Sequence, residues 1–149
     1  MGLIDDLRPG PVGLDSAVFI YFIEEDDRLL SIVKPLFAAI DRGVLQGVTS
    51  GLTLLEVLVV PYRIGDFSLA EQYEALLTRS RGLRLVDLDR ALLRSAALLR
   101  ATLRLKAPDA IQIAAALGAR CSAFLTSDRK IRPVPGLKVL QLRDYHEAD

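Results

Sequence analysis

The chain has 149 residues, the size of one domain that buries its own core. Hydrophobic residues make up 51% and charged residues 26%, which is typical of a folded globular protein and excludes a disordered one. No apolar run approaches the ~18 uncharged residues of a membrane span. Residues 1–10 also lack the apolar stretch of a signal peptide, so we expect a cytoplasmic protein without membrane contact.

The chain has a single cysteine, Cys121, and a single histidine, His146. One cysteine excludes an intrachain disulfide and a cysteine-based zinc site, and we expect Cys121 to be a small buried hydrophobe. Serine and cysteine nucleophiles need an imidazole held rigidly beside them, whereas His146 lies near the C-terminus, where chains commonly fray. Any catalysis is therefore expected to use carboxylates.

The net charge is zero, but the two halves of the chain differ. Residues 1–75 hold 5 Lys/Arg against 12 Asp/Glu, and residues 76–149 hold 14 against 7. Two interpretations remain open: a strongly charged partner, or two halves of one domain that neutralise each other.

Short strand patterns alternate with helix patterns along the chain. The first half predicts a strand at 12–14, a helix at 17–23 capped by Asp15 or Ser16, a helix at 29–42 containing Pro35, a strand at 47–49, and a helix capped by Ser50 that ends near Pro61. The second half begins with a predicted helix that starts at a capping box of Ser68 and Glu71 and reaches Arg79. Two further helices are predicted, one at 89–104 started by Asp87 or Asp89 and one at 110–117 opened by Pro108 and Asp109. Strands are predicted at 83–86, 123–126 and 139–142. This alternation favours an α/β fold with a parallel sheet.

No repeat, low-complexity stretch or linker divides the chain. We expect one domain at 11–143, preceded by an N-terminal extension at 1–10 and followed by a C-terminal tail at 144–149.

Glu56 stands inside the apolar run Leu-Leu-Glu-Val-Leu-Val-Val. One helical turn away lie Leu52 and Val59, so Glu56 is expected to share a face with core residues. Burial of an unpaired carboxylate costs several kcal/mol. The structural alternatives are an internal salt bridge to an arginine, or a helix rotated so that Glu56 reaches solvent.

Three aspartates stand beside predicted strand ends or helix starts. Asp15 and Asp128 follow strands, and Asp109 opens a helix; each position also has a local explanation as a cap or a turn residue. Because the carboxyl ends of parallel strands form the ligand crevice of an open sheet, we expect these three and Glu56 to converge. Carboxylates about 4 Å apart repel by roughly 4 kcal/mol at an effective dielectric of ~20, so such a cluster needs a cation. Oxygen ligands without imidazole or thiolate favour Mg²⁺ or Mn²⁺, and such sites act on phosphates.

The segments that carry the four acids resemble, in order, the four motifs of PIN domains. They are Leu14–Ile20, Thr49–Val57, Ala107–Leu117 and Leu125–Asp128. The acids lie 41, 53 and 19 residues apart, as in small single-domain PIN proteins, and the resemblance covers nearly the whole chain after Gly10.

The resemblance implies a three-layer α/β/α fold with a central, mainly parallel sheet. It also implies a metal-dependent ribonuclease, most like the VapC-type toxins of prokaryotic toxin–antitoxin pairs, with RNA as substrate, a small antitoxin protein as partner, and a homodimer. One or two Mg²⁺ or Mn²⁺ ions are expected, with Asp15, Glu56 and Asp109 on the main ion and Asp128 positioning a second ion or water. Ser16 and Thr126 are expected to support the site through their hydroxyls.

Positive side chains near the acids are candidates for RNA contact. Lys106, Arg129 and Lys130 adjoin the expected site. A stripe of arginines on the 89–104 helix is either a further RNA track or a solvated face: Arg90, Arg94, Arg100 and Arg104. The aromatic residues of the first two long helices are either core or a groove for an antitoxin peptide: Phe19, Tyr21, Phe22 and Phe37.

Other functions compete with this interpretation. A catalytically inactive PIN-like domain would serve as an RNA-binding or scaffold module, and metal binding would discriminate the two. An aspartate-nucleophile phosphatase needs a second Asp two positions after Asp15, where this chain has Ala17. A receiver domain fits poorly, and a dinucleotide fold lacks its glycine fingerprint.

Overall fold

The computed structural model describes residues 2–146 and contains one five-stranded sheet. The strand order is β3-β2-β1-β4-β5, and all neighbouring strands are parallel. The strands are β1 (Val12–Leu14), β2 (Gly47–Ser50), β3 (Leu83–Val86), β4 (Ala123–Thr126) and β5 (Lys138–Gln141). The helices are α1 (Leu3–Leu7), α2 (Ser16–Ile23), α3 (Leu30–Asp41), α4 (Gly51–Ile64), α5 (Phe67–Arg79), α6 (Arg90–Leu103), α7 (Ala107–Gly118) and the 3-10 turn η1 (Leu142–Tyr145).

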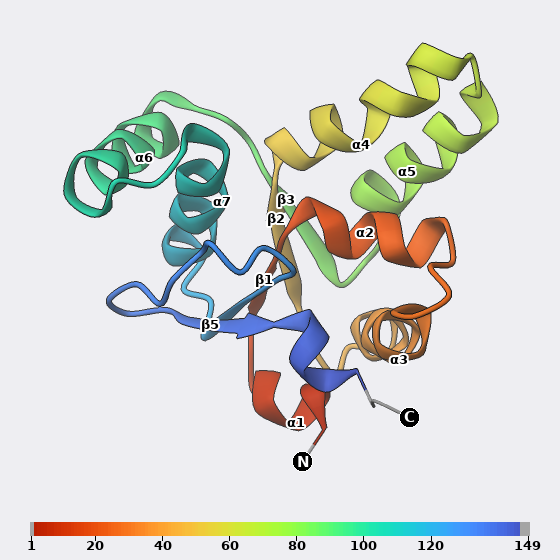
Figure 1. Cartoon of the computed structure of the whole chain (residues 1–149), viewed down its shortest axis with the longest axis horizontal. Helices are drawn as coiled ribbons and strands as arrows, with labels where there is room; N and C mark the ends of the chain where they lie inside the picture. Colours follow the sequence, from red (N-terminus) through yellow and green to blue (C-terminus); the bar gives the residue numbers. More distant parts are fainter. Residues whose placement is uncertain (1, 147–149) are drawn as a thin grey trace.

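Helices cover both faces of the sheet (Figure 1). The α6–α7 pair packs on one face, and α2, α3 and α5 pack on the other. The expected three-layer α/β/α fold with a parallel central sheet is confirmed. Within residues 2–146, no helix has both the length and the apolar composition that a membrane crossing requires.

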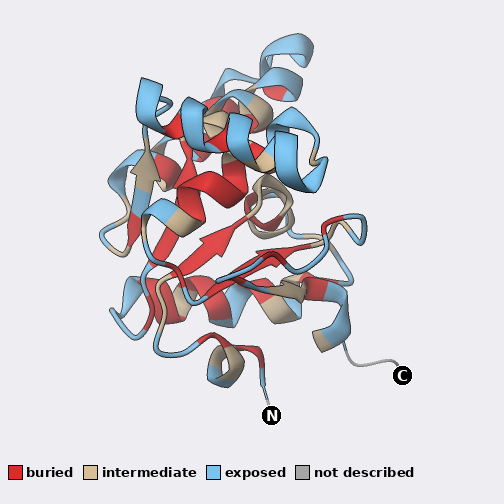
Figure 2. Cartoon of the chain, turned by 90° about the vertical axis from the view of Figure 1, so that its left-hand side faces the viewer, coloured by how far each residue is buried: buried red, intermediate tan, exposed pale blue. Residues whose placement is uncertain are grey.

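The core lies between the sheet and the inner helix faces, where buried residues gather (Figure 2). Every residue of β1, β2 and β4 is buried, as expected for parallel strands covered on both faces. Gly13 lets β1 approach α7 closely, because a Cβ at this position would lie 2.9 Å from Ala116 Cβ and 2.8 Å from Phe124 Cδ1.

The strand order reverses direction at β1. The strands β1, β2 and β3 follow one another toward one edge of the sheet, and β4 then pairs with the other side of β1. Such a reversal opens a crevice at the carboxyl ends of the strands on either side of it. In this chain those ends belong to β1 and β4.

Several predicted helix ends are confirmed. Asp15, Ser50 and Asp89 cap α2, α4 and α6 through side-chain oxygens that accept backbone N–H groups. The capping box of Ser68 and Glu71 is wrong.

Four predicted boundaries are corrected. The α5 helix starts at Phe67, and its N-cap is Asp66, which accepts from Leu69 N at 3.0 Å. The α4 helix runs past Pro61 to Ile64, so the loss of one hydrogen bond at Pro61 does not end the helix, which stops at Gly65 with a left-handed φ of 75°. The α7 helix starts at Ala107, with its proline in the first turn. The β5 strand lies one residue earlier than predicted, at 138–141.

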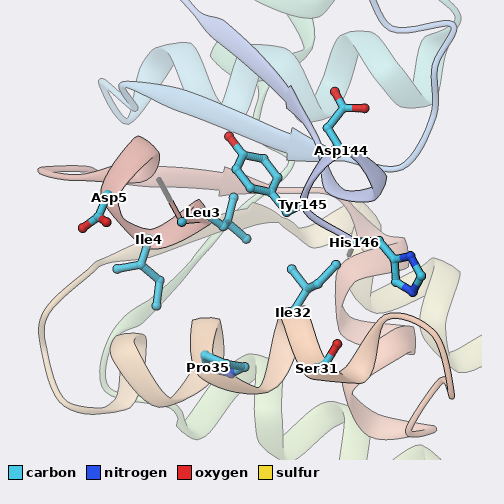
Figure 3. Close-up of a pocket in the computed structure, with 10 residues that line it drawn as sticks. Leu3, Ile4, Asp5, Ser31, Ile32, Pro35, Asp144, Tyr145 and His146 are labelled. Carbon is cyan, nitrogen blue, oxygen red and sulfur yellow. The ribbon is translucent and has the colours of Figure 1, made fainter. Parts of the chain in front are cut away.

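Residues 2–10 of the segment 1–10, predicted as an N-terminal extension, pack against the rest of the fold. They include α1, a helix that the sequence pattern does not predict, and this helix buries Leu3 and Leu7. Asp6 accepts from the Tyr145 hydroxyl at 2.5 Å, which links α1 to η1. Beside this contact, residues of α1, α3 and η1 line a hollow of about 450 Å³ (Figure 3). Of the predicted tail 144–149, residues 147–149 lie outside the described residues.

Candidate active site

Asp15 lies directly after the central strand β1 and is held by two hydrogen bonds. Its Oδ1 accepts from Ser16 N at 2.8 Å, and its Oδ2 accepts from the Thr126 hydroxyl at 2.6 Å. Thr126 is the last residue of β4 and is fully buried. The pairing of β1 with β4 therefore fixes the carboxylate of Asp15 at the carboxyl edge of the sheet.

The Thr126 hydroxyl also connects Asp15 to Asp128. It accepts from Asp128 N at 3.0 Å, while the Asp128 carboxylate accepts from Lys130 N at 2.9 Å. Gln141 at the end of β5 donates to the Asp128 carbonyl at 3.2 Å. These bonds hold the turn after β4 so that Asp128 stays close to Asp15.

Glu56 lies on α4 and Asp109 lies in the first turn of α7. The expectation that Glu56 shares a core face is wrong, because Val59 is 41% exposed and Glu56 itself is half-buried. The alternative of an internal salt bridge also fails: within residues 2–146 the ion pair that forms joins Arg129 to Asp144.

We call the four predicted acids the acidic cluster: Asp15, Glu56, Asp109 and Asp128. Charges within this cluster contribute to the pKa shifts of Asp15, Glu56 and Asp109. Burial is the largest cause that raises the pKa of Asp15, and the charge of Asp128 adds to it against the lowering effect of the Thr126 hydrogen bond. Burial likewise raises the pKa of Glu56, opposed by a hydrogen bond from Ser16 and increased by the charges of Asp15 and Asp109. Burial raises the pKa of Asp109 too, with further contributions from the charges of Asp128 and Asp15. Carboxylates from four separate segments thus face a shared region.

The chemistry of this donor set fits a divalent cation. All the side chains are oxygen ligands, and the raised pKa values mean that a cation would relieve the cost of ionising them together. Among the described residues, however, no three carboxylates lie close enough to form a ready-made coordination sphere. Cation binding would therefore require side-chain rotation at the cluster.

The predicted basic residues lie at the surface around the cluster. Lys106 is the N-cap residue of α7, and its charge opposes the rise in the pKa of Asp109. Arg129 forms the surface ion pair with Asp144 at 2.9 Å, and Lys130 is exposed. The arginines of the predicted stripe on α6 and at its C-cap are all exposed, which fits a solvated face.

Aromatic residues of the first helices divide between core and surface. Phe19 is fully buried, whereas Phe22 stacks on Phe37 at 4.3 Å between ring centroids, and the pair lines an open groove of about 340 Å³. Tyr21 donates to the Ser127 hydroxyl at 3.1 Å, beside the acidic cluster.

A buried polar network beneath the cluster is missed by the sequence prediction. Gln112 of α7 is 4% exposed and hydrogen-bonds Ser50 and Thr53. The available signal was the single amide within the apolar run 110–117.

A family model for the PIN domain matches residues 12–137, a span that includes all four members of the acidic cluster. The chain belongs to the PIN-domain family. Members of this family are typically nucleases. No curated protein matches the chain.

Solved PIN-like structures share the fold at low sequence identity. A toxin–antitoxin complex from Klebsiella pneumoniae superposes with a TM-score of 0.63 at 19% identity, covering 85% of this chain and 94% of that one. VapBC2 from Rickettsia felis, bound to a DNA fragment from its promoter, superposes with a TM-score of 0.62 at 16% identity, covering 87% and 97%. At these identities the likeness establishes the fold.

Proposed function

We propose that this PIN domain is a divalent-metal-dependent endoribonuclease, the toxin of a type II toxin–antitoxin pair. The observation that carries the proposal is the acidic cluster at the carboxyl edge of the sheet, where burial and then neighbouring carboxylate charges raise the pKa values of Asp15, Glu56 and Asp109. The fold shared with two toxin–antitoxin structures supports the biological role.

We assign the main cation to Asp15, Glu56 and Asp109, and a second cation or water to Asp128. When bound, Mg²⁺ or Mn²⁺ would activate water and neutralise charge on the phosphoryl oxygens of RNA. The hydrogen bonds from Ser16 N and the Thr126 hydroxyl fix the orientation of the Asp15 carboxylate, which would be one ligand of this cation. Thr126 thereby supports the site, and Ser16 does so at Glu56 as well.

We propose that Lys106, Arg129 and Lys130 contact the RNA backbone. All three are exposed beside the acidic cluster, and phosphate contact from such side chains supplies most of the sequence-independent affinity for nucleic acid. The ion pair with Asp144 is exposed on both sides, so its loss on RNA binding costs little.

We propose that the groove beside Phe22 and Phe37 receives an apolar side chain of the antitoxin. Its walls come from α2, α3, α5 and β3, and they carry one exposed charge of each sign, Lys34 and Asp41, beside the apolar surface. Substitution Ala38→Trp would fill the groove without truncating the core. We expect it to abolish co-purification of an antitoxin co-expressed with the chain, whereas unchanged co-purification would contradict this assignment.

We propose that a second copy of the chain covers the outer face of α4 and the start of α5. Six large apolar side chains there are 41–68% exposed: Leu55, Val59, Val60, Tyr62, Ile64 and Phe67. An apolar surface of this kind is uncommon on a monomer and marks a protein interface. A convex helix face suits an isologous contact, in which the same surface is used on both subunits.

Cleavage of a generic single-stranded RNA tests the proposed activity. We expect cleavage with Mg²⁺, none with EDTA, and none for Asp15→Asn or Asp109→Asn with Mg²⁺. Asp5→Asn is a matched control, because Asp5 is exposed on α1, which precedes β1 and so lies at the opposite edge of the sheet from the cluster, and its variant should cleave like the unmodified chain. RNA binding without cleavage or cation binding would instead support the alternative of an inactive RNA-binding or scaffold module.

A further inference from the structure

A chain of buried hydrogen bonds runs beneath the acidic cluster, and Gln112 closes it. The Gln112 amide oxygen accepts from Ser50 Oγ at 2.9 Å and from Ser50 N at 3.3 Å, and its nitrogen donates to Thr53 Oγ1 at 2.7 Å. Thr53 Oγ1 lies 2.7 Å from Thr49 Oγ1, which in turn bonds the Leu14 carbonyl at 2.8 Å. The chain thus joins α7, α4, β2 and β1.

The position of each hydroxyl proton in this chain is determined. Because the Leu14 carbonyl only accepts, the Thr49 hydroxyl donates to it, and the proton between the two threonines must come from Thr53. Ser50 Oγ accepts from Leu52 N as the helix cap and donates its own proton to the Gln112 amide oxygen, which can only accept. At Gln112 the chain therefore requires both an acceptor and a donor, which a primary amide provides and a carboxylate or an apolar group does not.

Each end of this chain adjoins a member of the acidic cluster. Leu14 directly precedes Asp15. Glu56 follows Thr53 by three residues on α4, and Asp109 precedes Gln112 by three residues on α7, so each lies one helical turn from the bonded residue. Displacement of α4 or α7 along this contact would therefore move a carboxylate.

We infer that Gln112 is a positioning residue, which holds α4 and α7 against the end of β1 so that Asp15, Glu56 and Asp109 keep their mutual placement. The inference rests on the proposed function in one respect, namely that these carboxylates bind a divalent cation. Removal of a group that orients metal ligands typically weakens metal binding by about 10–100-fold.

The test measures Mn²⁺ binding by the full chain, with isothermal titration, for Gln112→Met and Gln112→Glu. The first variant removes donor and acceptor at similar volume, and the second keeps only acceptors. We expect both to raise the Kd for Mn²⁺ by about 10–100-fold.

Leu7→Ala is the control, because Leu7 is fully buried in α1 away from the chain of bonds. It should lower the urea midpoint as much as Gln112→Met does and change the Kd by less than about twofold. An equal loss of affinity in Leu7→Ala would show that Gln112 contributes only stability, and would overturn the inference.

Hydrogen exchange at the Ser50 amide separates this inference from the proposed function, because this N–H donates to Gln112 and its exchange is measured without metal. We expect faster exchange at Ser50 in Gln112→Met than in Leu7→Ala. If the unmodified chain does not bind Mn²⁺ while this difference appears, the proposed function fails and the structural contact stands. If the unmodified chain binds Mn²⁺ and Gln112→Met binds it equally well, the positioning role fails and the proposed function stands.

Discussion

Replacement of Thr126 by valine should destabilise the fold in a pH-dependent way. Valine keeps the branched shape of threonine but removes the hydroxyl that donates to Asp15 Oδ2 at 2.6 Å and accepts from Asp128 N at 3.0 Å. A hydrogen bond to a charged group contributes about 1.5–3 kcal/mol and a neutral one about 1 kcal/mol. With Asp15 ionised, the loss in free energy of unfolding should therefore be about 3 kcal/mol.

The pH dependence follows from the charge on Asp15. Burial raises the pKa of this carboxyl above its usual value of 3.8, so at pH 3, below that value, Asp15 is protonated and both lost bonds are neutral ones. The loss should fall to about 2 kcal/mol at pH 3. Because the Thr126 hydrogen bond lowers the pKa of Asp15, its removal raises that pKa further, which is why the loss is greater at high pH.

Urea unfolding followed by circular dichroism at pH 8 and pH 3, with EDTA present, measures both losses. Thr102→Val is the matched control, since the Thr102 hydroxyl is exposed on α6 and donates only to the Leu98 carbonyl. It should change stability by less than about 0.5 kcal/mol. A loss for Thr126→Val that is as small as the control, or equal at the two pH values, would refute the role given to this hydroxyl.

Three further predictions concern the surface and the charge of the site. Glu56→Gln should raise the free energy of unfolding by about 0.5–1 kcal/mol at pH 8 with EDTA, the size of a partly screened charge interaction, because the raised pKa of Glu56 makes its ionised form unfavourable in the folded state. The gain should disappear in urea titrations at pH 3, where Glu56 is protonated, and a gain that persists there would exclude this cause. Charge reversal in Arg129→Glu/Lys130→Glu should weaken RNA binding and reduce the slope of log K against log salt by about 1.4, from about 0.7 for each of two phosphate contacts, as measured by fluorescence anisotropy, and an unchanged slope would remove these residues from the interface. Phe67→Asp should convert a dimer to a monomer in sedimentation velocity, whereas Leu98→Asp on the exposed side of α6 should not, and a monomer in the unmodified chain would contradict the proposed interface.

The fold and the acids could be predicted because their signals are local. Strands of three or four residues alternate with capped helices, and Asp15 and Asp109 stand where a strand ends or a helix begins. The motif resemblance then fixes the order of the four segments, and the PIN family is confirmed.

Other features depend on tertiary contacts that periodicity does not carry. The α1 helix has only five residues, so its two buried leucines form no recognisable pattern. The apolar residues Leu55 and Val59 indicate a helix face, but the pattern does not distinguish a face covered by this chain from one left exposed. Gln112 is equally ambiguous, because an amide on an alanine-rich helix is expected at the surface until its partners are known.

Cation binding at the acidic cluster tests the central claim most directly. Titration of the unmodified chain with Mn²⁺, followed by electron paramagnetic resonance of the free ion, should show one or two bound ions per chain at neutral pH. Asp109→Asn should lose the tighter of these sites while keeping its circular dichroism spectrum. A chain that binds no Mn²⁺, or an Asp109→Asn variant that binds it as tightly as the unmodified chain, would contradict the account.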